Sequence, residues 1–202
     1  MEQPIAGLGK DEVYKLLNCI VVPRPIAWIT SVNGDGLVNL APYSTFTIVS
    51  YDPPLLGVNI LSQADGRRKD TAHNIIGSGE YVVHIADETM AAALHASAFA
   101  HPPHVSEVEL LQLELAPSAL VRPPRLAAAP LALECRLSQV INFGPAAEFV
   151  VGEVVHIHSR EGLINDNKIQ TADLRPLSRL GGPVYGTLGR TITMQPGGKQ
   201  QS

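Results

Sequence analysis

Cysteine is scarce in this chain, and so are the segments that mark exported or membrane-embedded proteins. The only two cysteines, Cys19 and Cys135, lie far apart inside apolar runs and form no CxxC pair, which is typical of a reduced cytosolic protein. The N-terminus has no basic stretch followed by an apolar core, and no apolar run approaches the roughly 18 residues of a membrane span. We therefore expect a cytoplasmic protein that is neither exported nor membrane-spanning.

A surplus of positive charge is also missing. The net charge is -4 and the pI is about 5.9, whereas a surface for nucleic acid needs an excess of cations. The glycine-rich signatures GxGxxG and the P-loop are absent, so a Rossmann or Walker-type domain lacks its sequence support. Nucleic acid is excluded as a partner, and the local cluster Arg67-Arg68-Lys69 stands out on an acidic chain.

Glycine and proline, in contrast, are plentiful. The 17 glycines and 16 prolines are spread along all 202 residues, which indicates many short elements joined by turns. With 45% apolar residues the chain can bury a core of its own. We expect one domain over residues 1–192, followed by a disordered tail over residues 193–202.

The spacing of apolar residues predicts six strands and few helices. Asn33 to Gly36, "NGDG", predicts a hairpin turn, and residues 131–143 alternate apolar side chains with polar ones such as Glu134, as in a half-buried strand. Strands are expected over residues 19–32 (interrupted by prolines), 37–50, 55–61, 81–86, 131–143 and 149–158, and helices over 11–18, after the basic cluster, and over 88–100. Because the strands follow one another as hairpins, the pattern favours a mainly β fold with peripheral helices, an antiparallel barrel, over a doubly wound sheet.

The basic cluster belongs to the stretch "GRRKDTAHNII", residues 66–76, which has two interpretations. Lys69 would add a full charge and Thr71 a hydroxyl donor to the N–H groups of a helix N-terminus, which together suit a phosphate group. Asp70, however, would compete for the same N–H groups if it caps the helix. On this stretch alone an Asp-capped helix after a solvated basic loop is the favoured interpretation.

A second polar stretch runs over residues 23–46. Arg24 lies between two prolines that fix the backbone around it, and Pro42 interrupts the pairing of a strand that otherwise resembles a buried one. Short polar side chains line that strand: Asn39, Ser44, Thr45 and Thr47. Such a broken, polar-lined strand suits a planar heterocycle with imide donors and acceptors, and it equally suits a bulged edge strand with ordinary turn chemistry.

Four motifs in this order, "PRPIAW", "NLAPYS", "DPP" and "KDT", resemble the flavin reductase-like family with the FMN-binding split-barrel fold. The resemblance is strongest to the branch of flavoredoxin and of nitrilotriacetate monooxygenase component B, and it extends over nearly the whole chain, through residues 106–137 and 174–189. It implies an antiparallel, Greek-key-like split β-barrel and a homodimer that binds FMN near its interface. Residues carried over by motif as FMN-binding are Arg24, Trp28, Thr30, Asn39, Ala41, Ser44, Thr45, Thr47, Asn59, Lys69, Asp70 and Thr71.

The resemblance places Lys69, Asp70 and Thr71 at the FMN phosphate and so reverses the interpretation of the basic stretch. Within it we expect Lys69 and Thr71 to bind, Asp70 to cap and orient the helix, and Arg67 and Arg68 to face solvent. Over residues 94–106 the chain fits the family pattern less well, so the resemblance assigns no contact to that loop.

In such a protein FMN carries the redox step, with hydride passing from NAD(P)H to the flavin, so no protein nucleophile is required. Tyr185 and His84 are the side chains to examine beside the flavin, although a structural role is favoured for each. Two functions share these motifs: a flavin reductase that supplies reduced FMN to a partner monooxygenase or another acceptor, and a flavoredoxin-like electron carrier without significant NAD(P)H turnover.

Histidines offer a metal-binding alternative. His156 and His158 point to the same side of a predicted strand, and His101 and His104 flank two prolines. No Asp, Glu or Cys at a suitable spacing completes a site, so the sequence predicts no metal centre.

Overall fold

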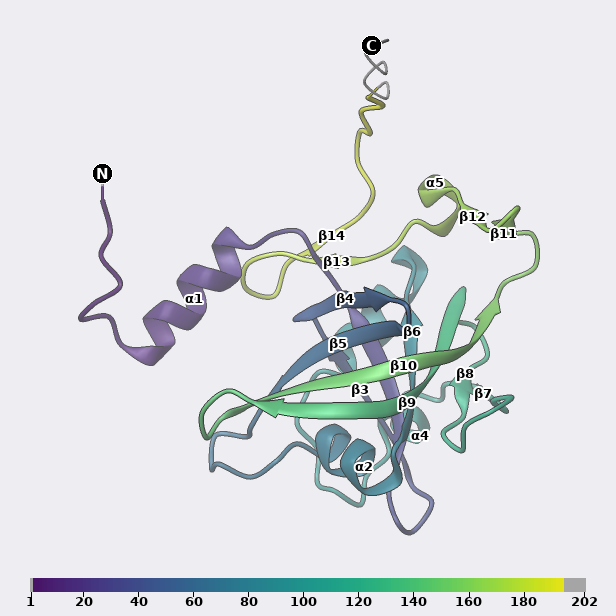
Figure 1. Cartoon of the computed structure of the whole chain (residues 1–202), viewed down its shortest axis with the longest axis horizontal. Helices are drawn as coiled ribbons and strands as arrows, with labels where there is room; N and C mark the ends of the chain where they lie inside the picture. Colours follow the sequence, from purple (N-terminus) through teal and green to yellow (C-terminus); the bar gives the residue numbers. More distant parts are fainter. Residues whose placement is uncertain (1, 195–202) are drawn as a thin grey trace.

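The computed structural model describes residues 2–194 and consists mainly of antiparallel β-structure (Figure 1). Residues 195–202, most of the tail expected to be disordered, lie outside the described residues. The main sheet has seven strands in the order β3-β2-β6-β9-β10-β5-β4. Its strands are β2 (Ala27–Val32), β3 (Val38–Tyr43), β4 (Phe46–Tyr51), β5 (Pro54–Leu61), β6 (Glu80–Ile85), β9 (Leu131–Asn142) and β10 (Ala147–Ser159). The predicted fold class, mainly β with peripheral helices, is confirmed.

The sheet curls so that its two ends meet. The outermost strands, β3 and β4, follow each other in the sequence with only Ser44 and Thr45 between them. Two residues cannot cross a flat seven-strand sheet, in which neighbouring strands lie about 4.8 Å apart, so the two edges must come together. No ladder joins β3 to β4 in the described chain, which leaves the barrel split along this line. The single strand expected over residues 37–50 is therefore two strands, with the edge-strand position of Pro42 consistent with its missing N–H.

The concave side of the sheet carries the barrel core. Ile29, Val58, Val83 and Val150 from four strands are fully buried there, and Ile75 from α2 (Asp70–Ser78) packs against them. Figure 1 shows α2 lying against one end of the curled sheet. The helix ends at Gly79, whose positive φ of 74° is a conformation glycine adopts without strain. This packing fixes where the N-terminus of α2 lies relative to β3.

The outer face of the sheet is also covered, which the sequence did not predict. Residues 117–126, here called the cover segment, lie over the strands and are held by buried polar side chains. Thr30 Oγ1 donates a hydrogen bond to the carbonyl of Pro124 at 2.6 Å, and the N–H of Leu126 donates to His84 Nε2 at 2.9 Å. Glu134 lies on this face and is fully buried, although the alternation of its strand indicated a solvent-facing position.

Shorter elements surround the main sheet. The helices are α1 (Lys10–Ile20), the 3-10 helix η1 (Glu88–Met90), α3 (Ala91–Ala96), α4 (Glu107–Leu110) and α5 (Thr171–Leu174). The small sheets are formed by β1 (Arg24–Pro25), β13 (Ser178–Arg179) and β14 (Tyr185–Gly186), by β7 (Leu115–Ala116) with β8 (Arg125–Leu126), and by β11 (Ile164–Asn165) with β12 (Lys168–Ile169). Figure 1 shows α1 projecting away from the barrel, and no residue of this helix is buried.

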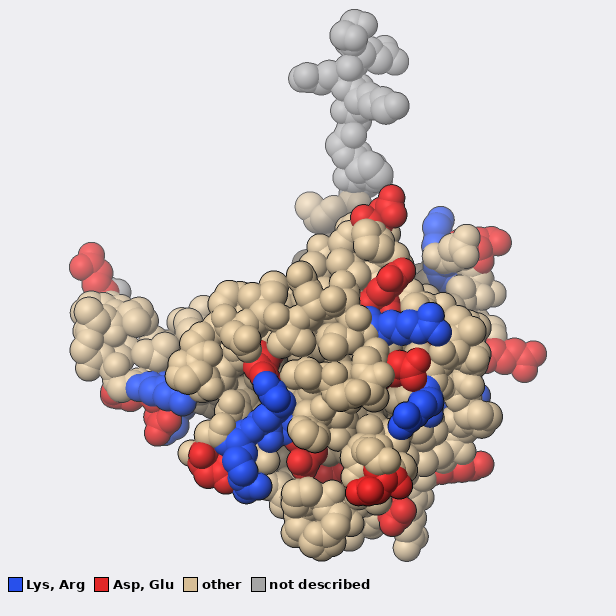
Figure 2. All heavy atoms as spheres, turned by 60° about the horizontal axis from the view of Figure 1, so that its bottom comes forward, with Lys and Arg blue, Asp and Glu red and all other residues tan. Residues whose placement is uncertain are grey.

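The surface carries charges of both signs. On the face drawn in Figure 2, Lys and Arg side chains lie next to Asp and Glu side chains. Among residues 2–194 no helix combines the length and the apolar character that crossing a membrane requires.

Candidate functional site

A hollow of about 410 Å³ lies beside the edge strand β3, a size suited to a small-molecule ligand. Three separate parts of the chain form it: the strand β3, the loop that leads into α2 together with the first residues of that helix, and the stretch from the end of α3 to the start of α4. Its lining residues are Asn39, Ala41, Pro42, Tyr43, Gln63, Ala64, Asp65, Lys69, Asp70, Thr71, Ser97, Ala98, Phe99, Ala100, His101 and Glu107. The hollow thus brings together five of the predicted ligand residues, namely Asn39, Ala41, Lys69, Asp70 and Thr71.

The N-terminus of α2 opens into this hollow without a side-chain cap. Lys69 is the N-cap residue, and its side chain cannot accept a hydrogen bond. The expectation that Asp70 caps the helix is wrong, because Asp70 is already the first helical residue. The N–H groups of Asp70, Thr71 and Ala72 precede the first intrahelical bond, from His73 to Lys69, and so have no partner within the helix. Uncapped N–H groups and the helix dipole make this end attractive to an anion.

The three adjacent cations have different roles. Arg67 pairs with Asp65 at 2.7 Å, and Arg68 forms a two-pronged ion pair with Glu148 on β10, with its shortest contact at 2.6 Å. Lys69 makes no ion pair within residues 2–194 and lines the hollow. The free positive charge therefore lies at the uncapped end of α2.

The floor of the hollow carries polar groups that point at a ligand. The Asn39 side chain donates to Thr71 Oγ1 at 2.7 Å, which ties the edge strand to the first turn of α2. The hydroxyl of Tyr43, which lines the hollow, is buried and has no hydrogen-bond partner in the described chain. Because buried polar atoms almost always have partners, this hydroxyl suits a bound molecule that supplies a donor or an acceptor. Asn59 lies on β5 and lines neither this hollow nor the next, although its Oδ1 is also buried without a partner in the described chain. The residues present therefore fit a polar, phosphate-bearing ligand.

Glu107 adds a carboxylate to this site that the sequence did not identify. Its Oε2 accepts the N–H of Leu40 at 2.9 Å, which satisfies an outward-facing group of the edge strand β3. Burial raises the pKa of Glu107, against the lowering effect of that hydrogen bond and of the nearby His101. A carboxyl group with a raised pKa beside a ligand-sized hollow is a common feature of functional sites.

A second hollow of about 630 Å³ continues the first, since Pro42 and Ala98 line both. Ser44, Tyr185 and Arg24 also line it. The Arg24 side chain is buried and donates hydrogen bonds to Ser44 Oγ and to the carbonyls of Asn18, Val21 and Leu180. Arg24 thus holds the N-terminal segment and the end of the chain together at one wall of the hollow.

Tyr185 stands at the same wall within a small cluster. Its hydroxyl lies 3.1 Å from His95 Nδ1, and the Arg179 guanidinium lies 4.7 Å from the centre of its ring. Both contacts fix the orientation of the phenol ring. The two hollows together make a groove, called the β3 groove below, that runs along the split edge of the barrel from the N-terminus of α2 to Tyr185.

Other predicted residues lie outside the β3 groove. Thr45 and Thr47 are exposed on and before β4, where Thr45 Oγ1 donates to the carbonyl of Asn59. Trp28 and Thr30 are fully buried on the outer face, with Trp28 Nε1 donating to Ser97 Oγ at 2.8 Å. Trp28 therefore supports the groove indirectly, through Ser97, which lines it.

His84 is a core residue. It is fully buried, its Nδ1 lies 2.8 Å from the carbonyl of Trp28, and its Nε2 accepts the N–H of Leu126. These bonds assign the proton to Nδ1, and burial lowers the pKa of His84 to about 4. Both ring nitrogens are used within the fold, so His84 has no free group for a flavin or a nicotinamide.

Sequence reasoning missed one wall of the groove. Residues 97–101 line the first hollow, although this part of the chain fits the family pattern poorly. The sequence predicted a helix over residues 88–100, but α3 ends at Ala96, and the residues after it turn into the hollow. They reach the site because α3 packs against the outer face of the barrel through Leu94, which is fully buried.

The chain is similar to known proteins over most of its length. The model of the flavin reductase like domain matches residues 19–174. The crystal structure of nitrilotriacetate monooxygenase component B from Bacillus cereus superposes with a TM-score of 0.93 at 38% identity, over 96% of this chain and 98% of that one. The structure of 2-nitrobenzoate 2-nitroreductase from Pseudomonas fluorescens superposes with a TM-score of 0.90 at 35% identity, over 100% of this chain and 99% of that one.

A third structure bears on the fold alone. A protein with a split-barrel domain from Shewanella frigidimarina superposes with a TM-score of 0.83 at 20% identity, over 94% of each chain. The split-barrel fold and the branch containing nitrilotriacetate monooxygenase component B are thereby confirmed. The chain belongs to the family of flavin reductase-like proteins.

Proposed function

We propose that the β3 groove binds FMN, with its phosphate at the N-terminus of α2, and that the protein is an NAD(P)H-dependent flavin oxidoreductase. One observation carries the proposal. Lys69, free of any ion pair within the described chain, lies at a helix end whose N–H groups are uncapped and open into a ligand-sized hollow. Charge-assisted bonds from an ammonium and from helix N–H groups are the usual means of binding a phosphate.

The proposed contacts divide between the two ends of the groove. The phosphate end consists of Lys69, Thr71 and the N–H of Asp70, whose own carboxylate is not a suitable phosphate ligand. The ring and ribityl chain would lie along the split edge, beside Asn39, Ala41 and Ser44, with Arg24 holding the wall at Ser44. Thr45, Thr47 and Asn59, carried over by motif, lie outside the groove and are not proposed as its ligands. Trp28 and Thr30 would contribute by fixing β2 and Ser97 from the outer face.

When bound, FMN supplies a hydride and electron acceptor that no side chain can replace. The side chains of the groove would bind and orient it. The Tyr43 hydroxyl, which lines the groove and is buried without a partner in the described chain, is available to a polar group of the ligand. Tyr185, fixed by His95 and Arg179, would border the place where a nicotinamide enters the second hollow, whereas His84 takes no part.

The protein is proposed to act as a homodimer. Two groups of exposed apolar side chains support this: Tyr14, Leu17 and Ile20 on α1, and Ile48, Val49 and Tyr51 on or next to β4. Exposed apolar groups of this extent indicate a protein-protein interface. Tyr14 also lines the second hollow, so a partner on α1 would close that end of the groove. Sedimentation velocity of the purified protein tests the proposal, and a monomer at micromolar concentration would contradict it.

Two assignments of the electron acceptor follow from the relatives. In the first, the protein hands reduced FMN to a partner monooxygenase, as the similarity to nitrilotriacetate monooxygenase component B suggests. In the alternative, it is an electron carrier that keeps FMN and turns over NAD(P)H poorly. The similarity to a 2-nitrobenzoate 2-nitroreductase makes 2-nitrobenzoate an acceptor to include in the assay.

Absorption spectroscopy of the purified protein is the first test. A yellow protein, or a colourless one that becomes yellow and retains FMN after gel filtration, supports the assignment, and failure to bind FMN refutes it. Anaerobic mixing with NADH and NADPH in separate experiments then distinguishes the two functions. Bleaching within seconds identifies the reductase, and a spectrum that stays unchanged with both nucleotides identifies the carrier.

A further inference from the structure

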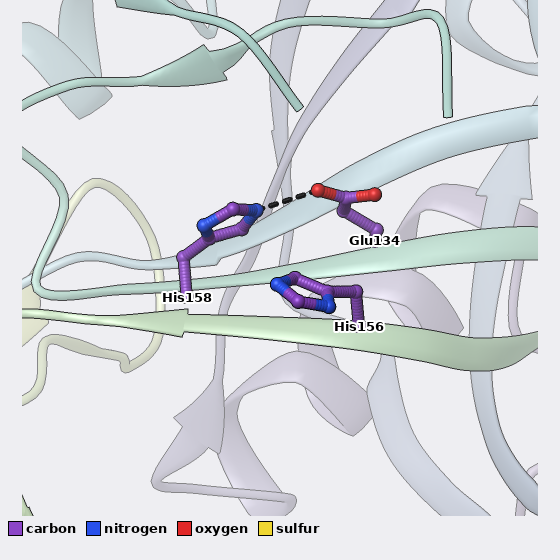
Figure 3. A group of neighbouring side chains, drawn as sticks. All are labelled: Glu134, His156 and His158. Carbon is purple, nitrogen blue, oxygen red and sulfur yellow. Dashed lines mark hydrogen bonds and ion pairs between the residues drawn. The ribbon is translucent and has the colours of Figure 1, made fainter. Parts of the chain in front are cut away.

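A cluster of metal-ligand side chains lies on the outer face of the sheet, away from the β3 groove. The pairing of β9 with β10 places Glu134 directly opposite His156, and His158 follows two residues later on the same side. One ligand atom from each of the three residues lies within 4.8 Å of the other two. Figure 3 shows both imidazoles and the carboxylate gathered in one place, with His158 and Glu134 in contact. The sequence predicted no metal site because Glu134 is 22 residues from His156, and only the register brings them together.

Glu134 is a buried and firmly oriented carboxylate. Oε1 accepts the N–H of Ala119 at 2.5 Å, and Oε2 accepts the N–H groups of Leu120 at 2.6 Å and Val121 at 3.2 Å. All three donors are backbone N–H groups, to which a carboxylate oxygen is the natural acceptor. Glu134 is therefore an oxygen ligand whose direction is fixed by its surroundings, as outer-sphere partners fix the ligands of known metal sites.

The two histidines differ in how they are engaged. His158 Nε2 lies 2.5 Å from Glu134 Oε1, and this contact is its one hydrogen bond in residues 2–194. The ring of His156 forms no hydrogen bond within the described chain, and its centre lies 4.6 Å from that of His158 in an edge-on arrangement. Both side chains are only partly buried. The His156 ring thus has no hydrogen bond within the described chain, and the His158 ring has one, to Glu134.

We propose that Glu134, His156 and His158 bind a divalent transition-metal ion, with Zn²⁺ as the ion to test. Two imidazole nitrogens and one carboxylate oxygen are ligands that zinc accepts at about 2.0–2.2 Å, which places neighbouring ligand atoms about 3.4 Å apart in a tetrahedron. The His158–Glu134 contact has to lengthen by about 1 Å and His156 has to approach. The ion would take the position of the hydrogen between His158 Nε2 and Glu134 Oε1, and the neutral His158 ring would carry its one N–H on Nδ1.

The surroundings define the fourth position and limit the affinity. A hollow lined by Arg125, His158 and Arg160 adjoins the cluster, so water or a small anion can complete the coordination. The two guanidinium groups oppose a cation there, although Arg160 also faces Asp87 at 3.4 Å. His84, which is buried on the same face, is neutral because burial lowers its pKa to about 4, and Glu80 faces Arg136 at 3.9 Å. The ion would join β9 and β10 to the cover segment, which Glu134 already holds, and would have no contact with the FMN groove.

Isothermal titration calorimetry with Zn²⁺ tests the site on full-length, untagged protein that has been freed of metal with a chelator. We expect one ion per chain for the wild type, and at least a tenfold (roughly) weaker affinity for His156→Ala. His156→Cys should restore tight binding, because a thiolate is a good zinc ligand. His104→Ala, which removes an exposed histidine outside the cluster, is the matched control and should bind as the wild type does.

Thermal unfolding gives an independent measure of the same site. Zn²⁺ should raise the Tm of the wild type and of His104→Ala, and leave that of His156→Ala unchanged, since only an ion bound to the folded state stabilises it. His156 forms no hydrogen bond in the described chain, so its replacement should fold normally, which circular dichroism checks. A wild type that binds no zinc, or a His156→Ala variant that binds as tightly as the wild type, overturns the proposal.

Discussion

Replacement of Lys69 by alanine offers the sharpest test of where the flavin phosphate lies. Lys69 is the one member of the Arg67-Arg68-Lys69 cluster that has no ion pair within residues 2–194. A hydrogen bond to a charged group contributes about 1.5–3 kcal/mol, and because Lys69 is exposed the lower end applies. A loss of about 1.4 kcal/mol corresponds to a tenfold change in Kd, so FMN should bind about tenfold more weakly to the variant.

Riboflavin provides the internal comparison, since it has the same ring and ribityl chain but no phosphate. Its Kd should change by less than about twofold, because the lost contact is to the phosphate alone. Titration of flavin-free protein, followed by quenching of flavin fluorescence, measures both constants under the same conditions. The matched control is Arg68→Ala, which removes an equal charge from the neighbouring position but from a side chain held by Glu148.

Two results would refute this reasoning. If Lys69→Ala weakens riboflavin as much as FMN, then Lys69 does not contact the phosphate and the variant has merely disturbed the groove. If Arg68→Ala weakens FMN as much as Lys69→Ala, the effect is one of general surface charge, and the position of Lys69 at the end of α2 has no special role.

Three further predictions concern stability. Burial lowers the pKa of His84 to about 4, so unfolding takes up a proton below about pH 6.5. The free energy of unfolding should therefore fall by up to about 3 kcal/mol between pH 6.5 and pH 4. In urea titrations, His84→Gln should lack this part of the decline. Gly152→Ala should destabilise the protein by about 1–3 kcal/mol, because the new Cβ would lie 2.1 Å from the Tyr81 hydroxyl oxygen. Gly77→Ala, in open space within α2, should stabilise it by about 1 kcal/mol. Thermal unfolding of the two variants would contradict this if their Tm values shifted in the same direction. Glu134→Gln should cost about 3 kcal/mol in urea unfolding because an amide cannot accept all the bonds that the carboxylate accepts, and a cost below about 1 kcal/mol would be inconsistent with a buried ionic network.

The elements with strong local signals could be predicted from the sequence. The hairpin turn at "NGDG" joins β2 to β3, and the alternating stretch that begins at Leu131 is β9. The start of α2 and the cluster of Asn39, Lys69 and Thr71 around one hollow follow from motifs that keep their spacing. In these cases a few neighbouring residues determine the backbone, so local chemistry is sufficient.

The features that depend on distant segments could not be predicted. Alternation assigns Glu134 to a polar, solvent-facing side, but the cover segment buries it completely. Arg68 is exposed, as expected, but its ion pair with Glu148, which lies 80 residues further along the chain, was not predicted. Residues 97–101 follow the end of α3, and Glu107 is the first residue of α4; both line the first hollow. Each of these positions is set by tertiary packing, which a pattern of neighbours along the chain does not encode.

The buried carboxylate of Glu134 also protects the barrel against misaligned pairing. Because side chains alternate across a strand, a slip of β9 by one residue would turn this charge toward the apolar interior. It would lie there near Tyr81 and Val150, and the N–H groups of residues 119–121 would lose their acceptor. An uncompensated buried charge costs about 3–5 kcal/mol, a large share of the stability of a chain of this size. Glu134 thus favours the correct register of β9 with its neighbours β6 and β10 over registers shifted by one residue.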